Sequence, residues 1–168
     1  MPACGRRCAA IALAVVLLIG ADRGTPAPTS FRFDPAAQPH LHRLWTSSLN
    51  ARTELVACLA ATIEGDTVRI SDVFPLVQGR SDSLGVSAST SLDTCGPPKW
   101  RGTVHTHIAL RDGVRPYSLF SGADRGVMMM WWQRWRADGV FCLIYSEQDV
   151  ICELEGPEGA VIFPRSHY

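Results

Sequence analysis

The chain has 168 residues, which is the length of one ordinary domain. Hydrophobic residues make up 46% and charged residues 19%, a balance that supplies a sizeable core and excludes a disordered chain. The formal net charge is zero, so there is no basic field of the kind that holds nucleic acid.

The first 24 residues differ from the rest of the chain. Two arginines precede an uninterrupted apolar run over residues 9–19. This pattern is typical of a signal peptide, and the run is too short for an ordinary membrane-spanning helix. We therefore expect residues 1–24 to export the protein to the periplasm or the extracellular space. Because Ile19 is a poor match to the small residue expected before a cut after Ala21, retention as an anchor through residues 9–20 stays open, and a misassigned start would leave the protein in the cytoplasm.

Residues 25–35 are rich in Pro, Thr and Ala and are predicted to be a linker, so the folded domain is expected over residues 36–168. Apolar residues at helical spacing predict a helix over 36–49, and a nearly continuous apolar run predicts a buried strand over 54–63. The same periodicities, together with turn residues, predict a returning strand over 68–73, a long loop over 75–99, a strand over 100–110, a loop over 111–117, a helix over 121–136, a hairpin from 141–145 and 150–154, and a short final strand over 160–163. This alternation indicates an α/β or α+β domain with a mixed β-sheet flanked by helices.

Four cysteines lie beyond the N-terminal segment: Cys58, Cys95, Cys142 and Cys152. An even number in an exported chain permits two disulfides, with three possible pairings. Buried free thiols that pack as small hydrophobic side chains are the alternative. No two of the four form a C-x-x-C pair, which argues against a cysteine zinc site.

His105-Thr106-His107 lies on the strand predicted over 100–110. Successive side chains of a strand point to opposite faces, so both imidazoles share one face and can reach a single ion. His40-Leu41-His42 has the same spacing but lies on a predicted helix, where the two histidines diverge by about 200°. We assign a metal role to the first pair alone.

A Ser-Gly-Ala-Asp run over residues 121–124 opens the second predicted helix. The ordinary interpretation makes Ser121 the N-cap and places Asp124 at the third helical position, where the helix dipole favours a negative charge. The same position keeps Asp124 ionised and directed outward, as a metal ligand must be. Glu54, at the head of the strand over 54–63, is either a surface residue or a general base that faces a cleft.

Glu54, then His105-Thr106-His107, then Ser121 and Asp124 occur in this order within one domain. The arrangement resembles the motif of the JAMM (JAB-domain, MPN+) zinc metalloprotease family, in which an upstream Glu precedes H-x-H and a downstream S-x-x-D. The run WRGTVHTH is similar to the Gly-x-x-His-x-His strand of that family, and the similarity covers residues 36–154.

The chain departs from the family pattern in three places. Ile108 stands where Pro is common, Cys58 stands where Gly is common, and the segment between His107 and Ser121 is longer than is usual. None of these departures removes a chemical group from the motif. A zinc deaminase, whose fold is distantly similar, would need H-x-E and P-C-x-x-C ligands, which the sequence after Cys95 does not supply.

The resemblance implies a single JAMM/MPN-type domain with a cytidine-deaminase-like fold and a zinc ion (Zn²⁺) bound by His105, His107 and Asp124. It implies that Glu54 accepts and returns a proton while Ser121 donates to the developing oxyanion. The expected activity is zinc-dependent hydrolysis of a peptide, isopeptide or related amide bond in a peptide or protein substrate. The alternative is an exported, non-catalytic module that binds a metal or a partner, and iron or manganese could occupy the same ligands.

Overall fold

The computed structural model describes residues 27–76, 88–111, 113–114, 117–157 and 159–168. The signal peptide or anchor predicted over residues 1–24 therefore lies outside the described residues. No helix within the described ranges is long and apolar enough to cross a membrane.

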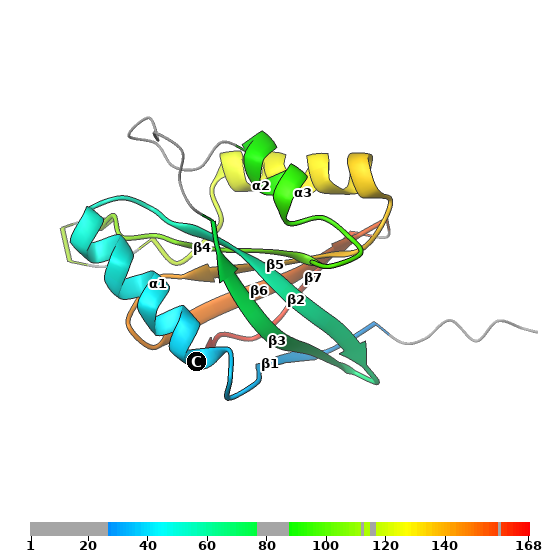
Figure 1. Ribbon diagram of the computed structural model, residues 1–168, viewed down its shortest axis with the longest axis horizontal. Coiled ribbons are helices and arrows are strands. Elements are labelled where there is room, and N and C mark those ends of the chain that lie inside the picture. The colour runs from blue at the N-terminus through cyan, green and yellow to red at the C-terminus, as the bar shows by residue number, and fades with distance from the viewer. Residues whose placement is uncertain (1–26, 77–87, 112, 115–116, 158) are drawn as a thin grey trace, which may run out of the picture.

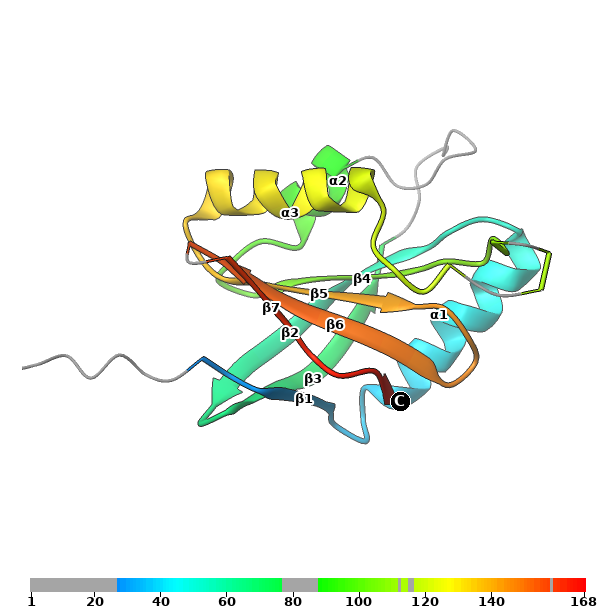
Figure 2. The same cartoon turned by 180° about the vertical axis from the view of Figure 1, so that it is seen from behind.

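The described residues form a mixed β-sheet with helices on both faces, built in chain order from β1 (Ser30–Phe33), α1 (Gln38–Ala51), β2 (Val56–Glu64), β3 (Thr67–Pro75), α2 (Ala88–Thr94), β4 (Gly102–Thr106), α3 (Gly122–Trp135), β5 (Gly139–Ile144), β6 (Asp149–Gly156), β7 (Gly159–Ile162) and β8 (Ser166–His167). The strand order is β1-β3-β2-β4-β5-β6-β7, and β8 pairs with β6. The β1–β3 and β4–β5 pairs are parallel, and the other pairs are antiparallel. Helix α1 covers one face, while α2 and α3 cover the other (Figures 1 and 2). The predicted mixed sheet flanked by helices is confirmed.

Helix α1 forms from the amphipathic segment in which a helix was predicted. Pro39 lies in its first turn, where the missing N–H costs no helical hydrogen bond, and Arg52 ends the helix in the left-handed conformation. Leu41, Leu44 and Ser48 are its buried residues and lie on one stripe. Packing of this stripe holds α1 against the sheet as far as its C-terminal end, which leads into β2.

Alternation along the strands gives the sheet two apolar faces. Val104 of β4 belongs to the main core on the face toward α1, whereas Phe141 of β5 packs with Trp131 of α3 on the opposite face. The ring centroids of Phe31 in β1 and Phe163 beyond β7 lie 5.7 Å apart. The sheet therefore curls, and its two ends approach each other around the main core.

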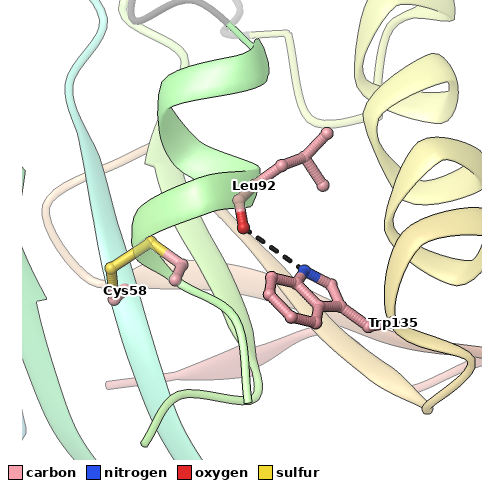
Figure 3. Close-up of a disulfide and its surroundings, with 4 residues drawn as sticks. Cys58, Leu92 and Trp135 are labelled. Carbon is pink, nitrogen blue, oxygen red and sulfur yellow. Dashed lines mark hydrogen bonds between the residues drawn. A yellow bond between two sulfur atoms is a disulfide. The ribbon is translucent and has the colours of Figure 1, made fainter.

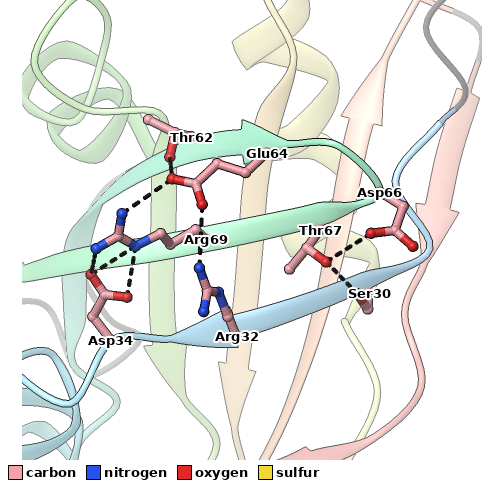
Figure 4. Close-up of polar contacts among 8 residues, drawn as sticks. All are labelled: Ser30, Arg32, Asp34, Thr62, Glu64, Asp66, Thr67 and Arg69. Carbon is pink, nitrogen blue, oxygen red and sulfur yellow. Dashed lines mark hydrogen bonds and ion pairs between the residues drawn. The ribbon is translucent and has the colours of Figure 1, made fainter.

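The linker predicted up to residue 35 is wrong for Ser30–Phe33, which form an edge strand paired with β3. Polar contacts tie this strand and the residue after it to the neighbouring strands (Figure 4): Arg32 donates to Glu64 of β2 at 3.2 Å, and Arg69 of β3 donates to Asp34 at 2.6 Å. Phe31 and Phe33 add apolar contacts with the main core. Pairing and packing with distant residues outweigh the loop-like composition of the segment.

A short helix, α2, replaces part of the long loop predicted over 75–99, and residues 77–87 of that loop lie outside the described residues. A disulfide between Cys58 of β2 and Cys95 anchors the end of α2 to the sheet (Figure 3). The indole N–H of Trp135 donates to the carbonyl oxygen of Leu92 at 3.3 Å and ties α2 to α3. Tertiary contacts thus stabilise a helix whose Ser- and Thr-rich sequence carries no helical apolar pattern.

The second disulfide joins Cys142 of β5 to Cys152 of β6, which lie directly opposite each other in the antiparallel pair. Of the pairings left open by the sequence, the structure therefore has Cys58 with Cys95 and Cys142 with Cys152. The alternative of free thiols is wrong. The first disulfide lies on the α2–α3 face of the sheet, and the second lies in the main core on the α1 face.

Candidate metal centre

Two histidines lie at the C-terminal end of β4, an interior strand of the sheet: His105 within the strand and His107 just after it. The strand ends at Thr106, earlier than predicted, but the backbone N–H of His107 still donates to the carbonyl of Ile144 at 2.8 Å. The alternation of side chains therefore continues past the end of the strand. The rings of His105 and His107 lie on the same face, with their centroids 5.0 Å apart.

Gly102 makes the close approach of β4 to β5 possible. Its φ is +153°, and a Cβ atom added there would lie 1.7 Å from the carbonyl oxygen of Val140. No other residue fits this position without a shift of backbone. The structure thus explains why Gly occupies position 102, three residues before His105. Only Gly allows the close pairing of β4 with β5 that positions both histidines.

The N-terminus of α3 presents Asp124. Ser121 is the N-cap: its Oγ accepts from the backbone N–H of Asp124 at 3.2 Å, and Oδ2 of Asp124 accepts from the backbone N–H of Ser121 at 2.6 Å. This reciprocal capping box confirms the predicted helix start and the position of Asp124 in the first turn. Oδ2 is engaged in the cap, which leaves Oδ1 to face an ion.

Arg125 fixes the first turn of α3 against the sheet. Its guanidinium forms a two-nitrogen ion pair with the buried carboxylate of Glu153 on β6, and it also contacts Glu155 at 3.1 Å. The same guanidinium lies 5.3 Å from the ring centroid of Phe120, and the Phe120 ring is 5.7 Å from that of His105. The ion pair with β6 thus holds the first turn of α3, which carries Asp124, against the sheet.

The candidate ligand atoms converge. The Nε2 atoms of His105 and His107 lie 3.2 Å apart, Nε2 of His105 is 3.3 Å from Oδ1 of Asp124, and Nε2 of His107 is 3.6 Å from Oδ2. With one atom from each residue, all three lie within 4.8 Å of one another. Ligand atoms that bind a tetrahedral zinc at about 2.0–2.2 Å are about 3.3–3.6 Å from each other. The two His–Asp contacts go to different oxygens of Asp124, so the three ligand atoms converge without yet having the full spacing of a bound ion. The donor set, two imidazoles and one carboxylate, suits zinc and leaves its fourth position for another ligand.

A backbone carbonyl fixes the orientation of the His107 ring. Nδ1 of His107 lies 3.1 Å from the carbonyl oxygen of Tyr117. A carbonyl only accepts hydrogen bonds, so Nδ1 carries the proton and Nε2 presents its lone pair to the cluster. Orientation of a histidine ligand through its other ring nitrogen is the usual arrangement in metal sites.

The charges of the cluster suit a cation. Burial raises the pKa of Asp124, but hydrogen bonds with His105 and His107 outweigh burial and hold that pKa well below its ordinary range. Burial lowers the pKa of His107, yet contacts with Asp124, Glu54 and the Tyr117 carbonyl together raise it above its ordinary value. The carboxylate is therefore ionised at neutral pH, and a metal would compete with a proton for the imidazole.

Glu54 lies just before β2, not at the head of the strand as predicted. Hydrogen bonds of the next residue, Leu55, fix the backbone beside Glu54. The N–H of Leu55 donates to Oγ1 of Thr106 at 2.9 Å, and the N–H of Thr106 donates to the carbonyl of Leu55 at 3.1 Å. Thr106 is the residue between the two histidines. The half-buried carboxylate of Glu54 is thus held beside them, and its charge acts on His107.

The structure brings together all five residues singled out in the sequence, namely Glu54, His105, His107, Ser121 and Asp124. Sequence reasoning missed the residues that position them: Thr106, Arg125, Glu153 and the Tyr117 carbonyl. One signal in the sequence could have revealed the Arg125–Glu153 pair. Glu153 lies in an apolar strand, and a Glu that is buried there requires a cationic partner.

No model of a known protein family matches the chain, and no curated protein matches it. Among solved structures, the solution structure of protein DSY2949 from Desulfitobacterium hafniense is similar, with a TM-score of 0.50 and 13% sequence identity. The match covers 81% of this chain and 92% of that chain. At this level of identity the likeness concerns the fold alone.

Proposed function

We propose that the protein is a zinc-dependent hydrolase of the JAMM type that cleaves a peptide, isopeptide or related amide bond. The observation that carries the proposal is the convergence of His105, His107 and Asp124, whose facing N and O atoms lie 3.2–3.6 Å apart. The placement of Glu54 beside this cluster supports it, as does Ser121 at the N-terminus of α3. The proposed fold is correspondingly a JAMM/MPN-type, cytidine-deaminase-like domain.

Each residue has a separate task in this proposal. When bound, zinc supplies Lewis-acid activation of water and polarises the amide carbonyl. Glu54 accepts a proton from the attacking water and returns it to the leaving amine. Ser121 Oγ accepts from the N–H of Asp124, and in this proposal its O–H donates to the developing oxyanion.

The two disulfides agree with the export predicted from residues 1–24, because disulfides persist in oxidising compartments. We therefore propose a periplasmic or extracellular enzyme, or one anchored through residues 9–20. Its substrate is then a peptide or protein of that compartment.

The metal is tested on purified residues 25–168. We expect about one zinc per chain by elemental analysis, because the proposed site has a single set of three protein ligands. His107→Ala and Asp124→Ala should each lose it. His42→Ala is the matched control, because His42 lies on α1 and should leave the metal content unchanged. Equal metal content in all four proteins would contradict the proposed ligands.

Turnover is tested with Glu54→Gln against a panel of peptide and isopeptide substrates. The variant should keep its zinc and lose hydrolysis by at least about a hundredfold, the usual contribution of a general base. Glu64→Gln, at the far end of β2, serves as the control and should keep the wild-type rate. If zinc-loaded wild-type protein cleaves no substrate of the panel, the non-catalytic binding module becomes the better description.

A further inference from the structure

A pocket of about 470 Å³ adjoins the candidate metal centre on the side of His107. His107 belongs to both sites: its Nε2 faces Asp124, and the residue also lines the pocket. The residues that line the pocket come from the C-terminal half of α1, the segment after β4 and the turn between β5 and β6. These parts of the chain lie at one end of the sheet (Figure 2). Only the His107 side chain separates a group bound in this pocket from the other candidate ligands.

The wall of this pocket is mostly apolar. Trp45 and Leu49 come from one face of α1, Ile108 and Leu110 follow β4, and Tyr145 follows β5. The volume falls in the range of about 300–1,000 Å³ that is typical of sites for small ligands. Leu49 and Leu110 are 48% and 50% exposed, so an apolar group bound between them would cover surface that now faces water.

Besides His107, the polar part of the lining comes from Ser146 and Glu147. The Ser146 hydroxyl is engaged within its own turn, where it donates to Oδ2 of Asp149 at 2.7 Å and accepts from the N–H groups of Gln148 and Asp149. Glu147 is exposed and adds a negative charge at the rim. An acidic group would meet this charge and lose its hydration against apolar walls, so the pocket selects an uncharged apolar group.

We propose that this pocket holds a large apolar side chain, aromatic or long aliphatic, of the peptide whose amide bond lies at the metal centre. The inference rests on the proposed hydrolase and names its substrate class: peptides with Phe, Leu or Met next to the scissile bond, and not Asp or Glu. Leu44 of α1 and Ile144 of β5 are buried in the main core. The helix and the strand that carry two of the walls are therefore anchored in the main core, which limits the ordering that a bound side chain would require.

The test compares kcat/KM for matched peptides that carry Phe, Leu, Ala or Asp next to one scissile bond, on either side of it. Zinc-loaded wild-type protein should prefer Phe or Leu over Ala by at least about tenfold, as an apolar pocket does, and should cleave the Asp peptide least. A double variant, Leu49→Gln with Leu110→Gln, should lose most of this preference and cleave the Ala peptide as the wild type does. Met129→Gln with Ile162→Gln makes the same change at two exposed residues outside the pocket and should keep the wild-type profile.

Binding gives a readout that does not depend on turnover. Zinc-loaded Glu54→Gln should bind the Phe peptide at least about tenfold more tightly than the Ala peptide. Equal cleavage of all four peptides by the wild type, or an unchanged preference in the Leu49/Leu110 double variant, overturns the inference and leaves the proposed hydrolase standing. Cleavage of no peptide or isopeptide at all overturns the proposed function, and the inference with it.

Discussion

The hydroxyl oxygens of Ser48 and Thr106 lie 2.6 Å apart in a fully buried contact between α1 and β4. Ser48 donates to the carbonyl of Thr53, so the Thr106 hydroxyl donates to Ser48, and Oγ1 of Thr106 accepts from the N–H of Leu55. One chain of hydrogen bonds thus joins the end of α1, the strand with both histidines, and the segment with Glu54. The proposed base and the candidate ligands are held by the same two hydroxyl groups.

Thr106→Val keeps the side-chain volume but removes the hydroxyl. The N–H of Leu55 and the hydroxyl of Ser48 then lose a partner in a buried place, and we expect the free energy of unfolding to fall by about 1–3 kcal/mol. Hydrolysis should fall as well, because Glu54 loses its support. The measurement is urea unfolding followed by circular dichroism.

Thr103→Val is the control for this change. Thr103 is also buried in β4, and within the described ranges its side chain has no hydrogen bond. The control should change stability little. Equal stability of Thr106→Val and the wild type would show that the buried contact does not support the fold.

Removal of Arg125 should destabilise the protein and weaken metal binding together. Arg125→Met leaves the carboxylate of Glu153, whose side chain is 4% exposed, without its cation. Loss of one partner of a buried pair costs about 3–5 kcal/mol, and we expect the lower end because the Arg125 side chain is 42% exposed. Thermal unfolding and zinc titration with a competing chelator give the two values.

Arg134→Met provides the comparison on the same helix. Arg134 pairs with Asp93 in a contact where both side chains are more than half exposed. Loss of such a pair costs at most about 1 kcal/mol and should leave zinc affinity unchanged. Similar losses in the two variants would show that burial of Glu153 does not decide the effect.

The two disulfides should differ in their contribution to stability. Cys58–Cys95 joins residues 37 apart in sequence, and Cys142–Cys152 joins residues 10 apart. By loop-closure entropy the first contributes about 4 kcal/mol and the second about 3 kcal/mol. Two double alanine variants, one for each disulfide, can be compared by denaturant unfolding, and a larger loss for Cys142 and Cys152 would contradict this ranking.

Zinc affinity should fall as the pH decreases, and the fall should begin above the pH expected for an ordinary histidine. A ligand must release its proton to bind metal, and the pKa of His107 is raised above its ordinary value of 6.5. Below that raised pKa the proton displaced from His107 contributes about a tenfold drop in affinity per pH unit. The lowered pKa of Asp124 keeps the carboxylate ionised throughout this range. Competition titrations at several pH values measure the profile.

Glu54→Gln provides an internal check on that profile. Its negative charge contributes to the raised pKa of His107, so the neutral variant should shift the onset toward lower pH. An onset that stays in place would mean that Glu54 does not act on the imidazole.

The sequence predicted the features whose signals are local. The capping box of Ser121 and Asp124 and the shared face of the two histidines each depend on residues within a few positions of one another. Features that join distant segments were missed: the partners Ser48 and Thr106 are 58 residues apart, and Arg125 is 28 residues from Glu153.

The same limit applies to the fold. β1 lies beside β3 because Ser30 pairs with Thr67, and nothing within the four residues of the strand indicates that partner. α2 has a sequence typical of a loop and is held by the Cys58–Cys95 disulfide and by the contact of Leu92 with Trp135. The order of strands in the sheet likewise depends on contacts between segments that no periodic pattern reveals.

The two halves of the candidate centre are anchored independently, His107 through the pairing of β4 with β5 and Asp124 through the ion pair of Arg125 with Glu153. Within the connecting segment over 108–120, the carbonyl of Tyr117 orients the His107 ring, whereas Ile108 and Leu110 make none of the hydrogen bonds described above for the ligands. Substitutions at Ile108 and Leu110, which line the pocket beside His107, would remodel the entrance while the reactive groups stay in place. Variation among descendants of this protein, or a directed-evolution library, should therefore concentrate its new specificities in that connection.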